Sequence, residues 1–155
     1  MRNVNQGDSI GTIAAHGASP GCSTGAHLHF EVHKNGLVQD PNNYLTQTDF
    51  QYSNGYNSDL YGTINPHGDM SWPIDKPIQI NQGFGAQKNS SIYGPAGHLG
   101  IDMDSLSSHT VKAVKAGKLY GGSIQCGGDY PGPLYYAKIE HEDGLTTWYL
   151  HMLAN

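Results

Sequence analysis

Residues 23–32 place two histidines two positions apart in a stretch that is typical of a β-strand. Side chains alternate between the two faces of a strand, so His27, His29 and Glu31 share one face and the apolar residues between them share the other. Two imidazoles this close together suit one metal ligand and one neighbouring proton carrier. A His-x-His pair alone is a weak signal, so its meaning depends on the rest of the chain.

A second pair of metal-ligating side chains lies further along, where His98 precedes Asp102 by four residues in a glycine-containing bend. A catalytic zinc takes three protein ligands and keeps a fourth position open for water. His98, Asp102 and one imidazole of the His27/His29 pair would supply such a set. A zinc ion held in this way lowers the pKa of its bound water towards ~7. The remaining histidine of the pair, together with His151, could then act as general base and acid or stabilise an oxyanion.

Other aromatic and ionisable residues are interpreted as structural. Glu31 and His33 share the strand face of the histidine pair, but they lie further along it, and we interpret both as surface positions. Phe30 and Trp148 are expected in the core. The remaining histidines fall in loops or at a turn and are interpreted as non-catalytic: His16, His67, His109 and His141.

The composition favours one β-rich domain. At 155 residues the chain is long enough to bury a core. Only 14% of its residues are charged, and its 21 glycines and 10 tyrosines favour strands joined by turns. The net charge of −5 gives no basic footprint, so a nucleic-acid partner is not expected. No apolar run approaches the ~20 residues that span a bilayer, and the first residues lack the apolar core of a secretory signal.

The two cysteines, Cys22 and Cys126, do not form a Cys-x-x-Cys pair, which argues against a thiolate zinc site. We favour a disulfide between them over two buried free thiols. A bridge closing a loop of about 100 residues stabilises the fold by roughly 4–5 kcal/mol in the chain-entropy model. It would also indicate an oxidising, extracytoplasmic setting.

The pattern of apolar residues and turns predicts a mostly antiparallel β fold without a convincing helix. A hairpin turn at Lys34-Asn35-Gly36 and another at Glu142-Asp143-Gly144 separate predicted strands. In the last strand, alternation puts Thr147, Tyr149 and His151 on one face. The strands are expected at residues 9–13, 27–33, 37–41, 110–120, 134–141 and 145–151, and residues 46–70 read as a linker or long surface loop.

Three motifs resemble those of the lysostaphin-type zinc endopeptidases, which cut peptide cross-links in bacterial cell walls. They are Gly97-His98-x-Gly100-x-Asp102, Thr147-Trp148-Tyr149-Leu150-His151-Met152 and Ser23-Thr24-Gly25-x-His27-Leu28-His29-Phe30. Flanking segments in 4–11, 40–45 and 111–117 match as well. The resemblance covers residues 4–45 and about 72–151.

The resemblance implies a role for each residue of the candidate site. Carried over by position, it assigns zinc to His98, Asp102 and His29, and it makes His27 and His151 the catalytic histidines. Tyr93 is the nearest candidate for a tyrosine that contacts the transition state. The implied fold is an antiparallel β-sheet with a duplicated hybrid motif and a groove bounded by variable loops.

The order of the motifs is reversed relative to the family, in which His-x-x-x-Asp comes first and His-x-His last. Joining the end of this chain to its start restores the family order, so the sequence resembles a circular permutant. Residues 1–155 would then form one peptidase domain, with 1–45 as the C-terminal half of the family fold, 46–70 as the linker and 71–155 as the N-terminal half. The alternative is a piece of a tandem array in which halves of neighbouring copies complete each other by domain swapping.

The sequence therefore predicts a secreted or extracytoplasmic zinc metallopeptidase that hydrolyses peptidoglycan cross-bridges or stem peptides. We expect a monomer, with a domain-swapped dimer as the alternative, and no membrane span. Two rival functions stay open: a catalytically silent scaffold that binds or regulates the wall, and a structural module of a phage or secretion assembly.

Overall fold

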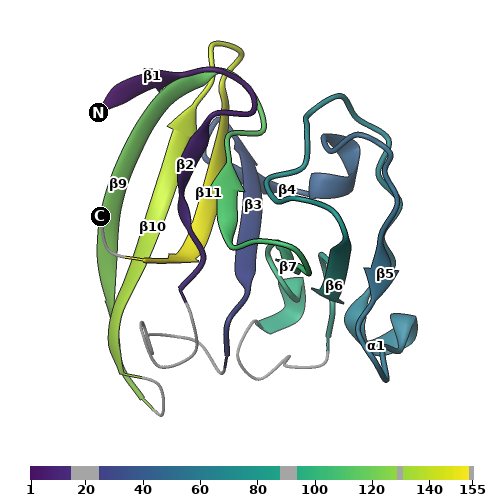
Figure 1. The fold of residues 1–155 in the computed structure, drawn as a ribbon. Helices are drawn as coiled ribbons and strands as arrows, with labels where there is room; N and C mark the ends of the chain where they lie inside the picture. Colours follow the sequence, from purple (N-terminus) through teal and green to yellow (C-terminus); the bar gives the residue numbers. More distant parts are fainter. Residues whose placement is uncertain (15–24, 88–93, 129–130, 154–155) are drawn as a thin grey trace.

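The fold is mostly β, as the sequence predicts. The structure is a computed structural model that describes residues 1–14, 25–87, 94–128 and 131–153. A nine-stranded sheet has the strand order β1-β9-β10-β11-β3-β7-β6-β5, with β4 also paired to β3, and a second sheet contains β2 and β8 (Figure 1). The strands are β1 (Arg2–Val4), β2 (Ser9–Thr12), β3 (Leu28–Lys34), β4 (Leu37–Gln39), β5 (Gln51–Tyr52), β6 (Ile78–Gln82), β7 (Ile101–Ser105), β8 (Thr110–Lys112), β9 (Gly117–Cys126), β10 (Gly132–Glu140) and β11 (Leu145–Met152).

The two halves of the chain share one sheet. β3 follows the alternation expected from the sequence, because Leu28, Phe30 and Val32 are fully buried while the residues between them are not. This strand pairs antiparallel with β11 on one side and with β7 on the other. β1 pairs with β9, and β2 pairs with β8. Strands from residues 1–45 are thus inserted among strands from residues 71–153.

Residues 46–70 lie along the edge of the sheet. They contain β5 and the single-turn helix α1 (Ser58–Tyr61), which the side chain of Asn57 caps. Leu45 and Met70 are both buried and form a β-bridge at the two ends of the segment. The sequence predicts no helix, and this prediction is wrong because α1 forms a single helical turn. Two 3₁₀ turns, η1 (Pro41–Asn43) and η2 (Gly94–Ala96), complete the described helical elements.

The large sheet is mixed rather than purely antiparallel. β5 runs parallel to β6, with Tyr52 opposite Ile80. A parallel pair needs a long crossover, and the segment between these strands, which includes α1, provides it. The other strand pairs of this sheet in the described part of the chain are antiparallel, as predicted.

Two local expectations need correction. The predicted strand at residues 110–120 is split into β8 and β9, because Ala113 and Val114 turn inward and are fully buried. Trp148 is half-buried and lies on the opposite face from Tyr149, where its ring is 5.1 Å from that of Tyr136. It is therefore not a core residue, whereas Phe30 is.

Cys126 ends β9 and is disulfide-bonded. Cys22, its predicted partner, lies outside the described residues. Among the described residues, the helices are too short and too polar to cross a bilayer.

The core lies between the two sheets. In Figure 1 the small sheet crosses in front of β11 and β3, and Ile10 and Val111 from it join Phe30 and Val32 in one apolar cluster. The ring of Phe30 is 5.4 Å from the ring of Tyr149. β3 is therefore paired with a strand on each edge, and its apolar face shares one cluster with residues of the small sheet.

Replacing Phe30 with Ala should lower the free energy of unfolding by about 3–5 kcal/mol, because the change leaves a cavity beside Tyr149. Leu37→Ala is the matched control: this side chain is 69% exposed, and its loss should cost less than about 0.5 kcal/mol. Urea unfolding of the two variants measures both values. Equal losses would contradict the placement of β3 in the core.

Candidate metal centre

Three side chains from neighbouring elements converge on one point. His29 on β3 pairs in register with Asp102 on β7, and His98 lies in the turn just before β7. Their possible ligand atoms all lie within 4.8 Å of one another. The Oδ1 atom of Asp102 is 2.7 Å from Nδ1 of His29 and 3.3 Å from Nε2 of His98. These are the three residues that the resemblance assigns to the metal, and they form a group that could hold a metal ion.

Two glycines let the turn before β7 approach its neighbours. Gly97 has a φ of 74°, and a Cβ there would lie 2.5 Å from the carbonyl oxygen of Gly85. A Cβ at Gly100 would collide with the carbonyl of Phe30 on β3. A side chain at Gly100 would push the turn away from β3, and one at Gly97 would push it away from Gly85, so the glycines of this motif serve close packing.

Each ligand histidine uses one ring nitrogen as an anchor and turns the other towards the shared point. Nδ1 of His98 donates to the carbonyl oxygen of Gly83 at 3.0 Å, which leaves Nε2 facing Asp102. Nε2 of His29 donates to Oε1 of Glu31 at 2.8 Å, which leaves Nδ1 facing Asp102. Ligand histidines in metal sites are held in this way, by a carbonyl or a carboxylate on the far ring nitrogen. The donor set and its anchors therefore could hold a metal ion.

The hydrogen bonds within this group shift the pKa values of His29 and of its two acidic partners. Burial lowers the pKa of His29, but its hydrogen bonds to Asp102 and Glu31 outweigh burial and raise the pKa to about 10. The same contacts act on the acids: burial raises their pKa values, yet the histidines bring that of Glu31 down to about 2 and hold that of Asp102 well below its usual range. The cluster therefore combines a protonated His29 with two carboxylates.

Two more histidines lie beside the three ligands. Nδ1 of His27 donates to the carbonyl oxygen of Gly25 at 3.0 Å, and its Nε2 is 3.6 Å from Oδ1 of Asp102. The ring centroid of His151 is 4.6 Å from that of His27 and 6.3 Å from that of His29. The structure thus brings His27, His29, His98, Asp102 and His151 together. Tyr93 lies outside the described residues.

His151 reaches this cluster because its strand is irregular. Regular alternation in β11 would place it on the core face with Tyr149. Instead, the pairing of β11 with β10 shifts register between Tyr135 and Tyr136, and His151 has a φ of 67°. A bulge of this kind re-aims a side chain, and a positive φ at a non-glycine residue is a strain that often marks a functional site.

The ring of His151 is buried, and among the described residues its Nδ1 has no hydrogen-bond partner. Burial lowers the pKa of this imidazole, and the nearby His27 and His29 lower it further, to about 3. It is therefore neutral at pH 7 and has one buried nitrogen available for a ligand.

The sequence interpretation missed Glu31 and His33. Glu31 is not a plain surface residue, because its two carboxylate oxygens accept hydrogen bonds from His29 and from Nε2 of His33. The alternation of side chains in a strand could have identified them, because it puts residues 31 and 33 on the same face as His29.

The other described histidines lie away from the centre. His67 and His109 are exposed, and His16 is outside the described residues. His141 is buried, donates from Nδ1 to the carbonyl oxygen of Ala116, and accepts at Nε2 from the hydroxyl of Thr147. Both of its ring nitrogens are used by the core, which agrees with a structural role.

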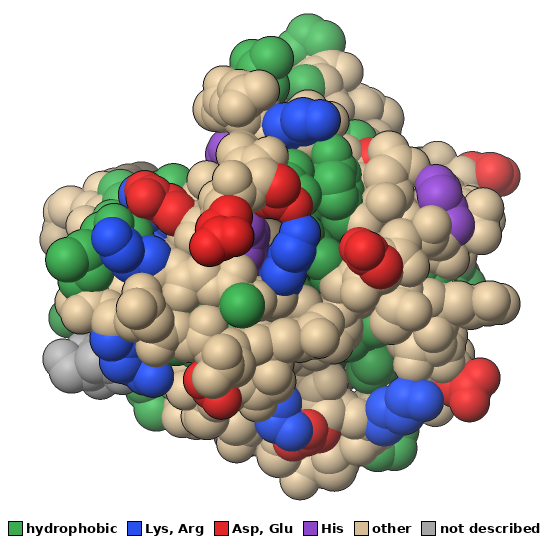
Figure 2. Space-filling view, turned by 90° about the horizontal axis from the view of Figure 1, so that it is seen from above, with side chains coloured by type: hydrophobic (Ala, Val, Ile, Leu, Met, Phe, Trp, Pro, Cys, Tyr) green, Lys and Arg blue, Asp and Glu red, His purple; other side chains and the backbone are tan. Residues whose placement is uncertain are grey.

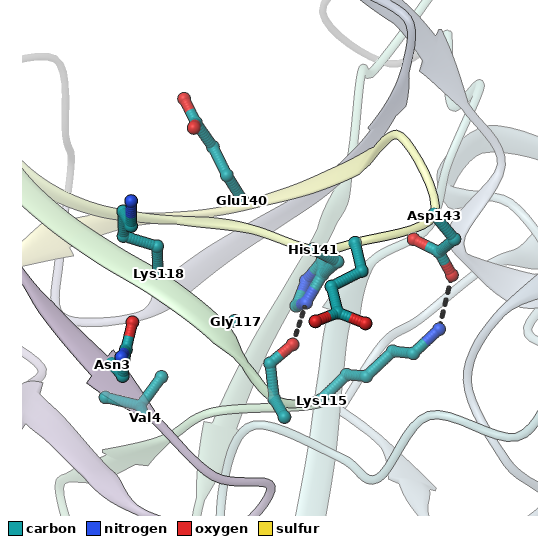
Figure 3. A pocket seen from close by; sticks show the side chains of 10 residues that line it. Asn3, Val4, Lys115, Gly117, Lys118, Glu140, His141 and Asp143 are labelled. Carbon is teal, nitrogen blue, oxygen red and sulfur yellow. Dashed lines mark hydrogen bonds and ion pairs between the residues drawn. The ribbon is translucent and has the colours of Figure 1, made fainter.

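A separate pocket of about 710 Å³ lies where β1, the start of β9 and the β10–β11 turn meet, and it shares no residue with the metal centre (Figure 3). Its wall includes His141 and the ion pair between Lys115 and Asp143. Figure 2, which views this end of the molecule, shows acidic and basic side chains interspersed over the surface. The pocket is thus lined by groups of both signs, and its only histidine already has two partners.

Comparison of the chain with protein-family models, with curated proteins and with solved structures gave no significant match. The case for a metal centre therefore depends on the geometry of the two histidines and the aspartate, in a fold that is mostly β.

Replacing His98 or Asp102 with Ala should abolish stoichiometric zinc binding, because two protein donors do not hold zinc tightly. His67→Ala is the control, since that imidazole is exposed and bonds only to the carbonyl of Asn65 among the described residues. Metal analysis after gel filtration measures the stoichiometry, and near-ultraviolet circular dichroism checks that each variant is folded. Full zinc content in a folded ligand variant would contradict the assignment.

Zinc binding should release protons, because a metal ion can reach Nδ1 of His29 only after the proton has left. The pKa of His29 in the metal-free protein is about 10, so this imidazole is charged at pH 7. We expect release of about one proton per zinc at pH 7 and binding that tightens roughly tenfold per pH unit from 6.5 to 8. Calorimetry in buffers of different ionisation enthalpy counts the protons. Heats that do not depend on the buffer would contradict this prediction.

Proposed function

We propose that this protein is a zinc-dependent endopeptidase that hydrolyses peptide bonds in the cross-bridges or stem peptides of bacterial peptidoglycan. The observation that carries the proposal is the convergence of the two ligand histidines and Asp102 with two further histidines, His27 and His151. A metal-binding scaffold needs the ligands alone. The additional pair is what a hydrolase needs to move a proton and to stabilise charge.

The chemistry divides between the metal and the protein. Zinc held by His29, His98 and Asp102 would supply a Lewis acid that activates water and polarises the carbonyl of the scissile bond. The protein must then accept a proton, stabilise negative charge on the carbonyl oxygen and return the proton to the leaving amine. We assign these tasks to His27 and His151, whose rings lie beside the three candidate ligands.

We assign the proton acceptor to His27. Its Nδ1–H is fixed by the carbonyl of Gly25, so the lone pair of the neutral ring lies on Nε2, the nitrogen that faces Asp102. A general base must lie within reach of the proton that it removes. Nε2 of His27 faces the side chain of a metal ligand, which is where water would be activated.

We assign charge stabilisation to His151. Its ring is neutral at pH 7 and buried, and its Nδ1 has no partner within the described part of the chain. A neutral imidazole in the right tautomer donates one N–H, and a preorganised donor in a buried site stabilises an oxyanion strongly. The strained backbone at His151 holds this donor beside His27.

The resemblance to lysostaphin-type enzymes supplies the substrate class. The three motifs of that family contain each residue that this mechanism uses. We propose the circularly permuted family fold on the same basis, supported by the insertion of β3 between β11 and β7. A disulfide at Cys126 supports an extracytoplasmic setting.

Zymography on purified peptidoglycan, followed by mass spectrometry of the fragments, tests the proposal. The zinc-loaded protein should clear the gel and release new amino termini from peptides. Chelation should stop the reaction, and added zinc should restore it. A protein that binds zinc and peptidoglycan without hydrolysis would instead be the silent scaffold.

His151→Ala should leave zinc bound but lower the turnover number by about 10²–10³-fold, because an oxyanion donor is lost. Zinc content and the rate of peptide release are measured on the same preparation. The control is His67→Ala, which should keep both values. A His151→Ala variant with unchanged turnover would remove this residue from the mechanism.

A further inference from the structure

We propose that His33 is a positioning residue for the metal centre, and that it acts on the ligand His29 through the carboxylate of Glu31. The inference rests on the proposed zinc site, although neither His33 nor Glu31 is a ligand in it. It adds a third layer to the site: the ligand, the carboxylate that orients the ligand, and the imidazole that orients the carboxylate.

The geometry forms a continuous line along one face of β3. Nε2 of His29 lies 2.8 Å from Oε1 of Glu31, and Nε2 of His33 lies 2.6 Å from Oε2 of the same carboxylate. The three residues are spaced by two positions, so the strand itself places their side chains on one face. Each carboxylate oxygen therefore has its own imidazole donor.

A second donor changes what the carboxylate can do. A glutamate side chain has several rotatable bonds, and fixing it costs conformational entropy. If His29 were its only partner, the Glu31 side chain would lose its conformational freedom each time it oriented His29. His33 fixes the second oxygen, so the carboxylate is already in place before a metal ion reaches Nδ1 of His29.

His33 is itself held from the neighbouring strand. Its ring lies 5.9 Å from the ring of Trp148 on β11, at an interplanar angle of 43°. Trp148 pairs in register with Glu31. This contact gives the half-buried Trp148, which is outside the core, a defined place on the site face of the sheet.

The role of His33 is separable from folding. Its side chain is 20% exposed and lies on the face opposite the core residue Val32. Removing the imidazole therefore opens no core cavity. Its loss should be felt at the metal, through Glu31, rather than in the stability of the fold.

A double-mutant cycle on zinc affinity tests the inference, with a chromophoric chelator as the competitor for the metal alone. Glu31→Ala should weaken zinc binding about 10–100-fold, and His33→Ala should weaken it about threefold to tenfold. The double variant should bind zinc like Glu31→Ala alone, because His33 has no effect once the carboxylate is gone. His33→Gln keeps an N–H donor and should bind within about twofold of the original protein, whereas His67→Ala is the matched surface control.

Nitrogen-15 NMR of the imidazoles gives a second readout that a purely structural residue would not move. With zinc bound, His29 should carry its proton on Nε2. His33→Ala should broaden or shift this signal, while the signal of His141 stays in place.

The outcomes separate this inference from the proposed function. Unchanged zinc affinity in His33→Ala, or an added loss when His33→Ala is placed on Glu31→Ala, would overturn the role of His33 and leave the peptidase intact. Zinc binding with the expected cycle but no hydrolysis would overturn the peptidase and leave the positioning role. A protein that binds no zinc would overturn both.

Discussion

The pairing of β3 with β7 is the constraint on which the candidate site depends. It sets His29 opposite Asp102 across two hydrogen-bonded strands, so the two groups meet whatever loop connects them. The apolar face of β3 fixes this register, because a slip by one residue would turn Phe30 out of the core and His29 into it. The hydrophobic core therefore determines the geometry of the polar site on the other face of the sheet.

The regular sheet accounts for only part of the site, and its irregularities provide the rest. Alternation alone presents His29, Glu31 and His33 on one face. His151 joins them only through a register shift and a positive φ, and such a conformation costs of order 1–3 kcal/mol. Pairing on both edges of the strand offsets this strain, since β11 lies between β10 and β3.

Features that depend on neighbouring residues could be predicted from the sequence, whereas features that depend on tertiary packing could not. The alternation in β3 and the hairpin between β10 and β11 are local patterns, and both were predicted. The convergence of His98 and Asp102 with His29 came from motifs, because no local rule brings residues so distant in sequence together. The parallel pairing of β5 and the burial of residues 113–114 depend on tertiary packing, for which a single sequence carries no periodic signal.

The contact of Glu31 with His29 was missed for a different reason. Strand alternation puts both residues on one face, but the distance of Glu31 along the strand predicts a solvent-exposed carboxylate. The carboxylate of Glu31 can be buried beside the neighbouring imidazoles because each of its oxygens accepts a hydrogen bond. The side chain's partners, and not its position on the strand, decide whether it is a surface residue.

The same balance of burial against charged partners applies to His29, which lies between the two acids. Burial disfavours the charged forms of Asp102 and Glu31 unless an opposite charge lies nearby. The proton on His29 supplies the missing positive charge, between Asp102 on one nitrogen and Glu31 on the other. A metal ion held by His29 and Asp102 would replace that proton on the Asp102 side, while Glu31 would keep its hydrogen bond on the other side. The metal would thus take the place of a proton between two side chains that the pairing of β3 with β7 holds in register.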